Sequence, residues 1–317
     1  MTHDTGPTAD GGTGSVAPTD GGTGGTRPSD AAVPVDRETA HETTTGTGLR
    51  ETVVSTAQVA AREYRLTLRR RWTVGVAVLF ALFSTALVFL GGSNVGPARV
   101  NAVLASFAQL GVYLVPLVAL AAGFDAVVGA DETGSLEMLL ALPLSSTAVV
   151  VGKYLGRALA LAGGTLAGFA VGGALLVRFA GVGVLGAYAR VALVAVASAL
   201  AFLGVSVLAS TLAREKTHAL GGVLAAWVWF VLVHDLVALG LVASLDLPQW
   251  VVGVAVLANP GDLFRVFVLR GIPTTAGGIA GVLTTTGLST PVLVAALAAW
   301  LVLPVAGAVV AFRRRSV

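Results

Sequence analysis

Residues 73–92 read TVGVAVLFALFSTALVFLGG, an apolar run without a single charged side chain. At 1.5 Å per residue, a helix of this length covers about 30 Å, which is the thickness of the hydrocarbon core of a bilayer. Further apolar runs of similar length follow at 104–124, 155–177, 191–212, 219–243 and 291–312. The sequence therefore predicts an all-α membrane protein with six transmembrane helices.

The composition supports this class. Hydrophobic residues make up 55% of the 317 residues and charged residues only 12%, whereas a soluble protein carries about 25% charged residues. A charge facing lipid costs roughly 2.5–3.5 kcal/mol, which explains the deficit. The chain has no cysteine, which excludes a disulfide framework, a zinc–cysteine site and a thiol nucleophile.

Two segments precede the first span. Residues 1–50 are rich in Thr, Gly, Asp, Pro and Ser, and we predict a disordered cytoplasmic tail because such a segment buries too little apolar surface to fold. Residues 51–72 are predicted to form an amphipathic interfacial helix. Its apolar residues recur at helical spacing, with arginines between them: Val53, Ala57, Ala60, Tyr64 and Leu68. Residues 73–317 then form the transmembrane domain.

The basic residues indicate the orientation. With six spans and a cytoplasmic N-terminus, the arginine clusters at 69–71 and 313–315 both lie inside, as the positive-inside rule requires. The outer segments then hold Arg99, Arg178, Arg190, Arg265 and Arg270. We therefore expect a multi-pass protein of the plasma membrane with both termini in the cytoplasm.

The loop after the second span carries a short helix. Its leucines share one face, and Pro143 should end it. Asp131 and Glu132 crowd its start, where the helix dipole favours acidic side chains. Composition alone favours an ordinary interfacial loop helix, and the functional alternative is a lever that docks into a cytoplasmic partner. The leucines are Leu136, Leu139 and Leu140.

This loop resembles that of ABC-2 type transporter permeases, which have an acidic residue, a Gly-Ser or Gly-Thr pair, a Leu-Leu pair and then Pro. The counterparts in this chain, with the adjoining acidic residue, are Asp131, Glu132, Gly134, Ser135, Leu139, Leu140 and Pro143. The resemblance implies a cytoplasmic coupling helix that contacts an ABC ATPase subunit, with ATP and Mg bound by that partner chain. It also implies a homodimer, since ABC-2 bundles need two membrane halves.

A narrower resemblance involves the segments 116–120, 124–132 and 259–265, which are similar to the permease of the nitrous-oxide-reductase maturation system. That family's permease works with a cytoplasmic ATPase and an outer-face β-helical protein in assembling copper-sulfur centres. Direct copper passage finds little support in the sequence, because copper paths usually offer soft ligands. The chain has no Cys, and its methionines are Met1 and Met138. The resemblance leaves export of a sulfur-containing species and transmission of motion to an outer partner as alternatives.

The loop between spans five and six contains a second helix. Asn259 can cap it, Pro260 suits its first position, and Asp262 lies in its first turn. Residues 250–257 are too short to span, so the two segments are predicted to form a re-entrant outer helix pair. The pair is either a structural cap or a surface for an outer partner, with Asn259, Pro260, Asp262 and Arg265 as contacts.

Three ionisable residues lie within or beside spans, where such groups are functional candidates by default. His234 and Asp235 lie inside the fifth span, and Asp125 ends the second. A proton relay and a structural polar contact are both open for the first two, while Asp125 suits an interface or capping role. We expect no metal site and no cofactor on this chain.

Sequence motifs distinguish the remaining classes of function. No Gly-x-x-x-x-Gly-Lys-Ser/Thr occurs, so the chain lacks a phosphate-binding loop for ATP. The chain lacks the groups that an intramembrane enzyme would use, because it has no Cys, no Gly-x-Ser-x-Gly and no His-Glu-x-x-His. An ion-coupled secondary transporter remains an alternative, although no internal repeat is visible. So does an ABC-2 exporter of another substrate. Membrane lipid is an expected partner, and nucleic acid is not.

Overall fold

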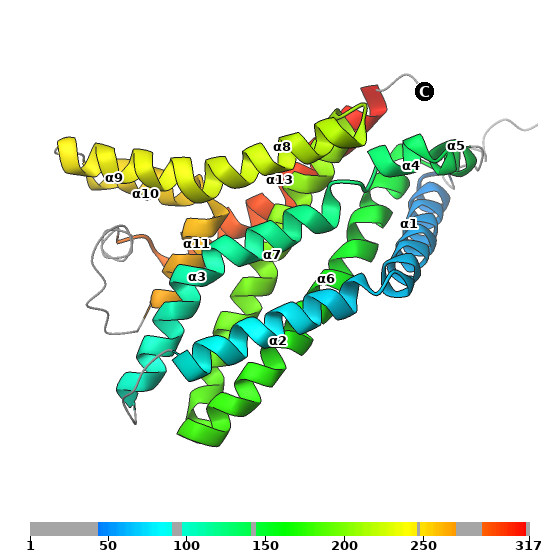
Figure 1. Ribbon diagram of the computed structural model, residues 1–317. Helices are drawn as coiled ribbons and strands as arrows, with labels where there is room; N and C mark the ends of the chain where they lie inside the picture. Colours follow the sequence, from blue (N-terminus) through cyan, green and yellow to red (C-terminus); the bar gives the residue numbers. More distant parts are fainter. Residues whose placement is uncertain (1–43, 91–96, 141–143, 246–247, 271–286, 315–317) are drawn as a thin grey trace, which may run out of the picture. The chain divides into compact units, whose positions relative to one another are not determined.

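In a computed structural model, residues 44–90, 97–140, 144–245, 248–270 and 287–314 are described, and they are almost entirely helical (Figure 1). Six helical stretches of this part are long and apolar enough to cross a membrane, which confirms the predicted fold class and span count. The predicted tail falls almost wholly outside the described residues. The spanning helices are α2 (Trp72–Leu90), α3 (Pro97–Gly123), α6 (Ser146–Ala180), α7 (Leu185–Leu212, after the 3-10 turn Val182–Val184), the stack α8–η2–α9 (Lys216–Val228, Trp229–Val233, His234–Ser244) and α13 (Thr290–Arg314).

Helix α6 begins earlier than the predicted span at residue 155. Its N-cap is Ser145, whose side chain accepts a hydrogen bond of 3.1 Å from the backbone nitrogen of Ala148. The two basic residues Lys153 and Arg157 interrupt the apolar pattern of this segment, but each is paired with a carboxylate. Because these charges are neutralised within the protein, the helix can keep both side chains inside the bundle.

One face of α6 consists of small residues. Five glycines and Ala160 recur at intervals of four residues, which places them along one stripe of a helix. A β-carbon at Gly156 would lie 2.5 Å from the carbonyl oxygen of Ala60 in α1 (Thr44–Arg69), and one at Gly168 would lie 2.5 Å from the β-carbon of Phe80 in α2. Both helices therefore approach the backbone of α6 more closely than any side chain would allow. The glycines are Gly152, Gly156, Gly164, Gly168 and Gly172.

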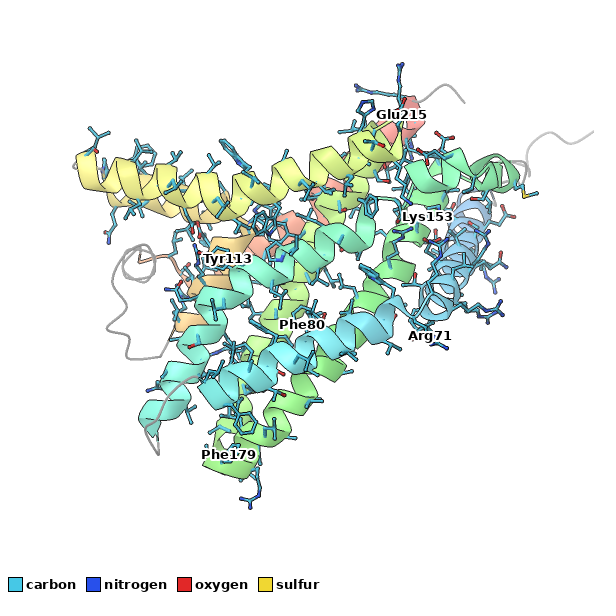
Figure 2. The ribbon with its side chains drawn as sticks, in the orientation of Figure 1. Arg71, Phe80, Tyr113, Lys153, Phe179 and Glu215 are labelled. Atoms are coloured by element: carbon cyan, nitrogen blue, oxygen red, sulfur yellow. The ribbon has the colours of Figure 1, made fainter. Side chains whose placement is uncertain are left out.

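The core lies around an aromatic cluster between α2, α3, α6 and α7. The rings of Phe80 and Phe107 each lie 5.5 Å from the ring of Phe169, and Figure 2 labels Phe80 inside the bundle. Tyr188 closes the cluster, and its hydroxyl donates a hydrogen bond of 2.8 Å to the carbonyl oxygen of Phe169. The only polar atom of this large side chain is thereby satisfied.

Helix α1 (Thr44–Arg69) begins before residue 51, where the sequence predicts it, and it packs on α6 through its buried Val59 and Ala60. The extension is about two turns, and adding turns to an existing helix costs little compared with starting one. Arg71 follows with a φ of 55° and directs the chain into α2. The location of α1 at the membrane surface stays a prediction.

Between α9 and α13, helices α10 (Gln249–Leu257) and α11 (Pro260–Leu269) meet at an angle of 109°. As predicted, the side chain of Asn259 caps α11 by accepting a bond of 2.8 Å from the backbone nitrogen of Gly261. Helix α11 is buried along almost its whole length, with the ring of Phe264 against Gly111 of α3. This packing brings polar residues of α11 up to α9.

Candidate functional site

The loop predicted to couple the bundle to a partner forms two short helices, α4 (Val128–Glu132) and α5 (Ser135–Leu140). Gly134, with a φ of 67°, breaks the helix between them, so Asp131 and Glu132 end α4 instead of starting the leucine helix. Ser135 starts α5, and its hydroxyl donates to the carbonyl oxygen of Ala130 at 3.1 Å. Pro143 and the side chains of Leu139 and Leu140 lie outside the described part of the chain.

Glu132 joins this segment to the fifth span. Its Oε1 accepts a hydrogen bond of 2.7 Å from the backbone nitrogen of Lys216, the first residue of α8. The first amide groups of a helix lack partners within the helix, and a carboxylate is a favourable acceptor for them. Glu132 therefore acts as a remote cap, and α4 and α8 are held together.

Four charged residues form what we call the inner cluster: Glu63, Asp125, Lys153 and Arg157. Arg157 lies at its centre and donates to Glu63 Oε1 at 2.8 Å, Asp125 Oδ1 at 2.5 Å and the carbonyl oxygen of Ala122 at 2.7 Å. Lys153 contacts the other oxygen of Glu63 at 3.4 Å. The cluster thus links α1, α6 and the turn between α3 and α4, and it leaves no carboxylate without a cation.

The electrostatics of Glu63 follow from this geometry. Burial alone would raise the pKa of Glu63, because a buried carboxylate loses its hydration. The positive charges of Lys153 and Arg157, and the hydrogen bonds that both donate, outweigh burial and hold the pKa of Glu63 below its ordinary value. The side chain is therefore ionised at neutral pH although it is only 6% exposed.

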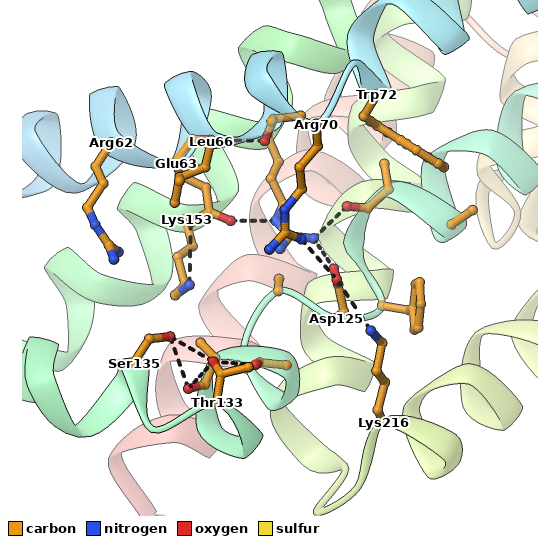
Figure 3. Close-up of a pocket in the computed structure, with 18 residues that line it drawn as sticks. Arg62, Glu63, Leu66, Arg70, Trp72, Asp125, Thr133, Ser135, Lys153 and Lys216 are labelled. Atoms are coloured by element: carbon orange, nitrogen blue, oxygen red, sulfur yellow. Dashed lines mark hydrogen bonds and ion pairs between the residues drawn. The ribbon is translucent and has the colours of Figure 1, made fainter.

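A pocket of about 340 Å³ opens beside the inner cluster. Figure 3 shows that α1, α6 and the start of α8 each contribute basic side chains to its wall. Arg62 and Arg70 come from α1 and its C-terminal turn, and Lys216 comes from α8. Arg70 and Lys216 approach Asp125 only to 3.8 and 3.9 Å, which is longer than a hydrogen bond.

A second set of polar residues, the α11 cluster, joins α11 to α9: His234, Asp235, Asn259, Asp262 and Arg265. Arg265 forms a two-pronged contact with Asp235, at 2.9 and 2.7 Å, and bonds Asp262 at 3.0 Å. His234 Nδ1 lies 3.2 Å from Asp262 and 3.1 Å from the side-chain nitrogen of Asn259. A protonated Nδ1 donates to Asp262, and an unprotonated one accepts from Asn259.

Asn259 also reaches the backbone of the fifth span. Its amide nitrogen donates a bond of 2.8 Å to the carbonyl oxygen of Phe230. Phe230 belongs to η2, a stretch of π-helix in the middle of this span. Such wide turns are rare and occur often at functional sites. The sequence indicated His234 and Asp235 as candidates, and the structure joins both to the predicted residues of α11.

The predicted outer contacts are buried within this chain. Asn259, Asp262 and Arg265 are at most 3% exposed, and Pro260 is buried beside them. Ligand atoms of His234, Asp235 and Asp262 lie within 4.8 Å of one another, close enough to hold a metal ion. Both carboxylates, however, are bonded to Arg265, which offsets one of the two negative charges, and a protonated His234 would offset the other.

Comparison of the sequence with known proteins identifies a described family. The model of the ABC-2 family transporter protein matches residues 57–317, which include both clusters and every described span. The chain belongs to the ABC-2 transporter family. It is similar to a probable ABC transporter permease protein NosY of Pseudomonas aeruginosa, with 34% identity over 82% of this chain and 98% of that protein. A protein of the same name from Stutzerimonas stutzeri is 35% identical over 81% of this chain and 97% of its own length.

In this ABC-2 permease, sequence reasoning found Asp125 and Glu132 but missed their partners. Lys153 and Arg157 lie one helical turn apart, a spacing that places both on one face of a helix. The sequence alone could therefore have indicated them as a pair. Their pairing with Glu63 was not readable, because about 90 residues separate the partners. The match to ABC permeases supports a multi-pass membrane subunit as the function of the chain.

Proposed function

We propose that this ABC-2 permease receives motion from a separate cytoplasmic ATPase through α4 and α5 and passes it into the bundle. The observation that carries the proposal is the bond from the backbone nitrogen of Lys216 to Glu132. Any displacement of α4 acts on α8 through this bond, and on α1 and α6 through Asp125 and Arg157. ATP and Mg belong to the partner, because this chain lacks a phosphate-binding loop.

Replacing Glu132 tests this role. The Glu132→Ala variant of the permease–ATPase complex in lipid nanodiscs removes the acceptor, whereas Gln would keep one; it should keep its bound ATPase but lose stimulation of ATP hydrolysis by the membrane subunit. Glu215→Ala is the matched control, since it removes the same charge beside α8 and its contact is with His218 in the same segment. Leu139→Ala and Leu140→Ala should weaken docking or coupling. Unchanged binding and stimulation in all three coupling variants would reject the proposal.

The resemblance to the nitrous-oxide-reductase system suggests the biological setting. We propose that the complex serves assembly of the copper-sulfur centres of that enzyme, together with an outer-face β-helical protein. Purification of the tagged chain from native membranes should recover a P-loop ATPase and a secreted β-helical protein. Recovery of the ATPase alone would keep the permease role and remove the support for this setting.

The cargo follows from the ligands that the chain offers. With no cysteine and only Met1 and Met138, the bundle lacks the soft ligands of a copper path. We propose that it exports a sulfur-containing species or transmits motion to the outer partner. Robust ATP-dependent copper uptake into inverted vesicles that contain the whole complex would overturn this view.

The proposed assembly is a homodimer in the plasma membrane with both termini in the cytoplasm. Its support is the exposure of the spans: only 11% of the α8–α9 window and 17% of the α13 window are buried in the single chain. Because the chain has no cysteine, single-cysteine variants can be labelled without background. Cysteines introduced at Arg50 and Arg314 should react only with reagents that cross the membrane, and a complex with one permease copy would contradict the homodimer.

A further inference from the structure

The pocket beside the inner cluster carries more positive charge than the fold uses. Its wall holds five cations and two carboxylates, an excess of three positive charges. Glu63 and Asp125 are both committed to Arg157 by short hydrogen bonds. The remaining cations therefore have weak partners or none.

Three of the cations that line the pocket, Arg62, Arg70 and Lys216, account for the excess positive charge. Arg62 has no ion-pair partner among the residues that the structure describes. Arg70 and Lys216 share Asp125 at 3.8 and 3.9 Å, and their side chains are 73% and 49% exposed. Cations that share a single distant carboxylate still repel one another, so an anion that enters the pocket relieves the repulsion.

The edge of the pocket is apolar. Leu66 and Trp72 line it beside the cations, and tryptophan is enriched at the membrane–water interface. From Trp72 onward, α2 exposes the apolar side chains Val74, Val78 and Leu82 on its outer surface. A ligand with a charged head and apolar tails would match this sequence of surfaces.

We propose that this pocket binds a phosphate group, supplied by the headgroup of an anionic phospholipid or by soluble phosphate. Arg62, Arg70 and Lys216 hold the phosphate oxygens, and Leu66 and Trp72 lie against the apolar part of a lipid. Arginine and lysine are the side chains best suited to this recognition. The site adds a lipid-sensitive contact to the same helices that the inner cluster joins.

Mass spectrometry of the intact full-length chain in neutral detergent tests the proposal, because no membrane surface charge is present there. Wild type should retain phosphatidylglycerol in preference to phosphatidylcholine. The double variant Arg62→Gln/Arg70→Gln should bind it on the order of 25-fold more weakly, at roughly fivefold for each lost hydrogen bond to the phosphate. The matched control is Arg65→Gln/Arg69→Gln, which removes the same charge from α1 at positions that do not line this pocket.

A second arm omits lipid and titrates inorganic phosphate, with phosphorus NMR as the readout. Phosphate binding that only the Arg62→Gln/Arg70→Gln pair abolishes, without retained phosphatidylglycerol, would support the site and assign it to a soluble ligand. Equal lipid retention by all variants, or equal loss in both double variants, would overturn the proposal. If the double variant fails to elute as folded protein, Lys216→Gln replaces it and should weaken phosphatidylglycerol binding about fivefold.

Discussion

Replacing Arg157 by Gln removes the centre of the inner cluster. Removing one partner of a buried ion pair costs roughly 3–5 kcal/mol, because the remaining charge stays buried without compensation. Here Glu63 keeps Lys153 at 3.4 Å, and Asp125 keeps two distant cations. We therefore expect a loss near the lower limit, about 3 kcal/mol, or roughly a 150-fold shift of the unfolding equilibrium.

The measurement is reversible unfolding of the purified chain in mixed micelles, titrated with denaturing detergent. Arg70→Gln is the control, because its side chain is 73% exposed and contacts Asp125 at 3.8 Å. An exposed pair of this kind contributes about 0–1 kcal/mol. A loss below about 1 kcal/mol for Arg157→Gln, or equal losses in the two variants, would show that Arg157 does not hold the inner cluster together.

Three further outcomes follow from the structure. The fold lowers the pKa of Glu63, so the stability advantage of wild type over Glu63→Gln should be complete above the ordinary value of 4.5 and shrink as the pH falls below it. Unfolding titrations between pH 3 and 8 measure this advantage. An advantage that grows on acidification would contradict the prediction. Gly168→Leu should cost about 1–3 kcal/mol or more, since a β-carbon there would lie 2.5 Å from a side-chain atom of α2. Gly163→Leu on the same helix meets nothing within 4 Å and should be at least as stable as wild type, because leucine favours a helix more than glycine does. Equal thermal midpoints for Gly168→Leu and Gly163→Leu would refute the close packing. Arg265→Met should destabilise the chain strongly, and adding Asp235→Asn should restore part of the loss; no coupling between the two would show that their contact carries little energy.

Local features of this chain could be predicted from its sequence. The spans appear as apolar runs, and the Asn259-Pro260 pair marks the start of α11 because capping depends on neighbouring residues. Long-range pairings could not be predicted in this way. Nothing near Glu63 indicates that its partners lie on α6, and nothing near Arg265 identifies Asp235. The extension of α6 through Lys153 was missed for the same reason, since hydropathy treats a paired charge like a free one.

The π-helical stretch η2 could not be predicted from the sequence pattern either, because no residue type in Trp229–Val233 specifies it. Its contact with Asn259 is made by the carbonyl oxygen of Phe230 and not by the phenylalanine ring. An alanine scan across these five positions would leave that oxygen in place and pass over the contact altogether. Substitutions at position 230 leave this hydrogen bond in place for the same reason. Only a shift in helical phase, such as deletion of a single residue from the stretch, would move the oxygen away from its donor.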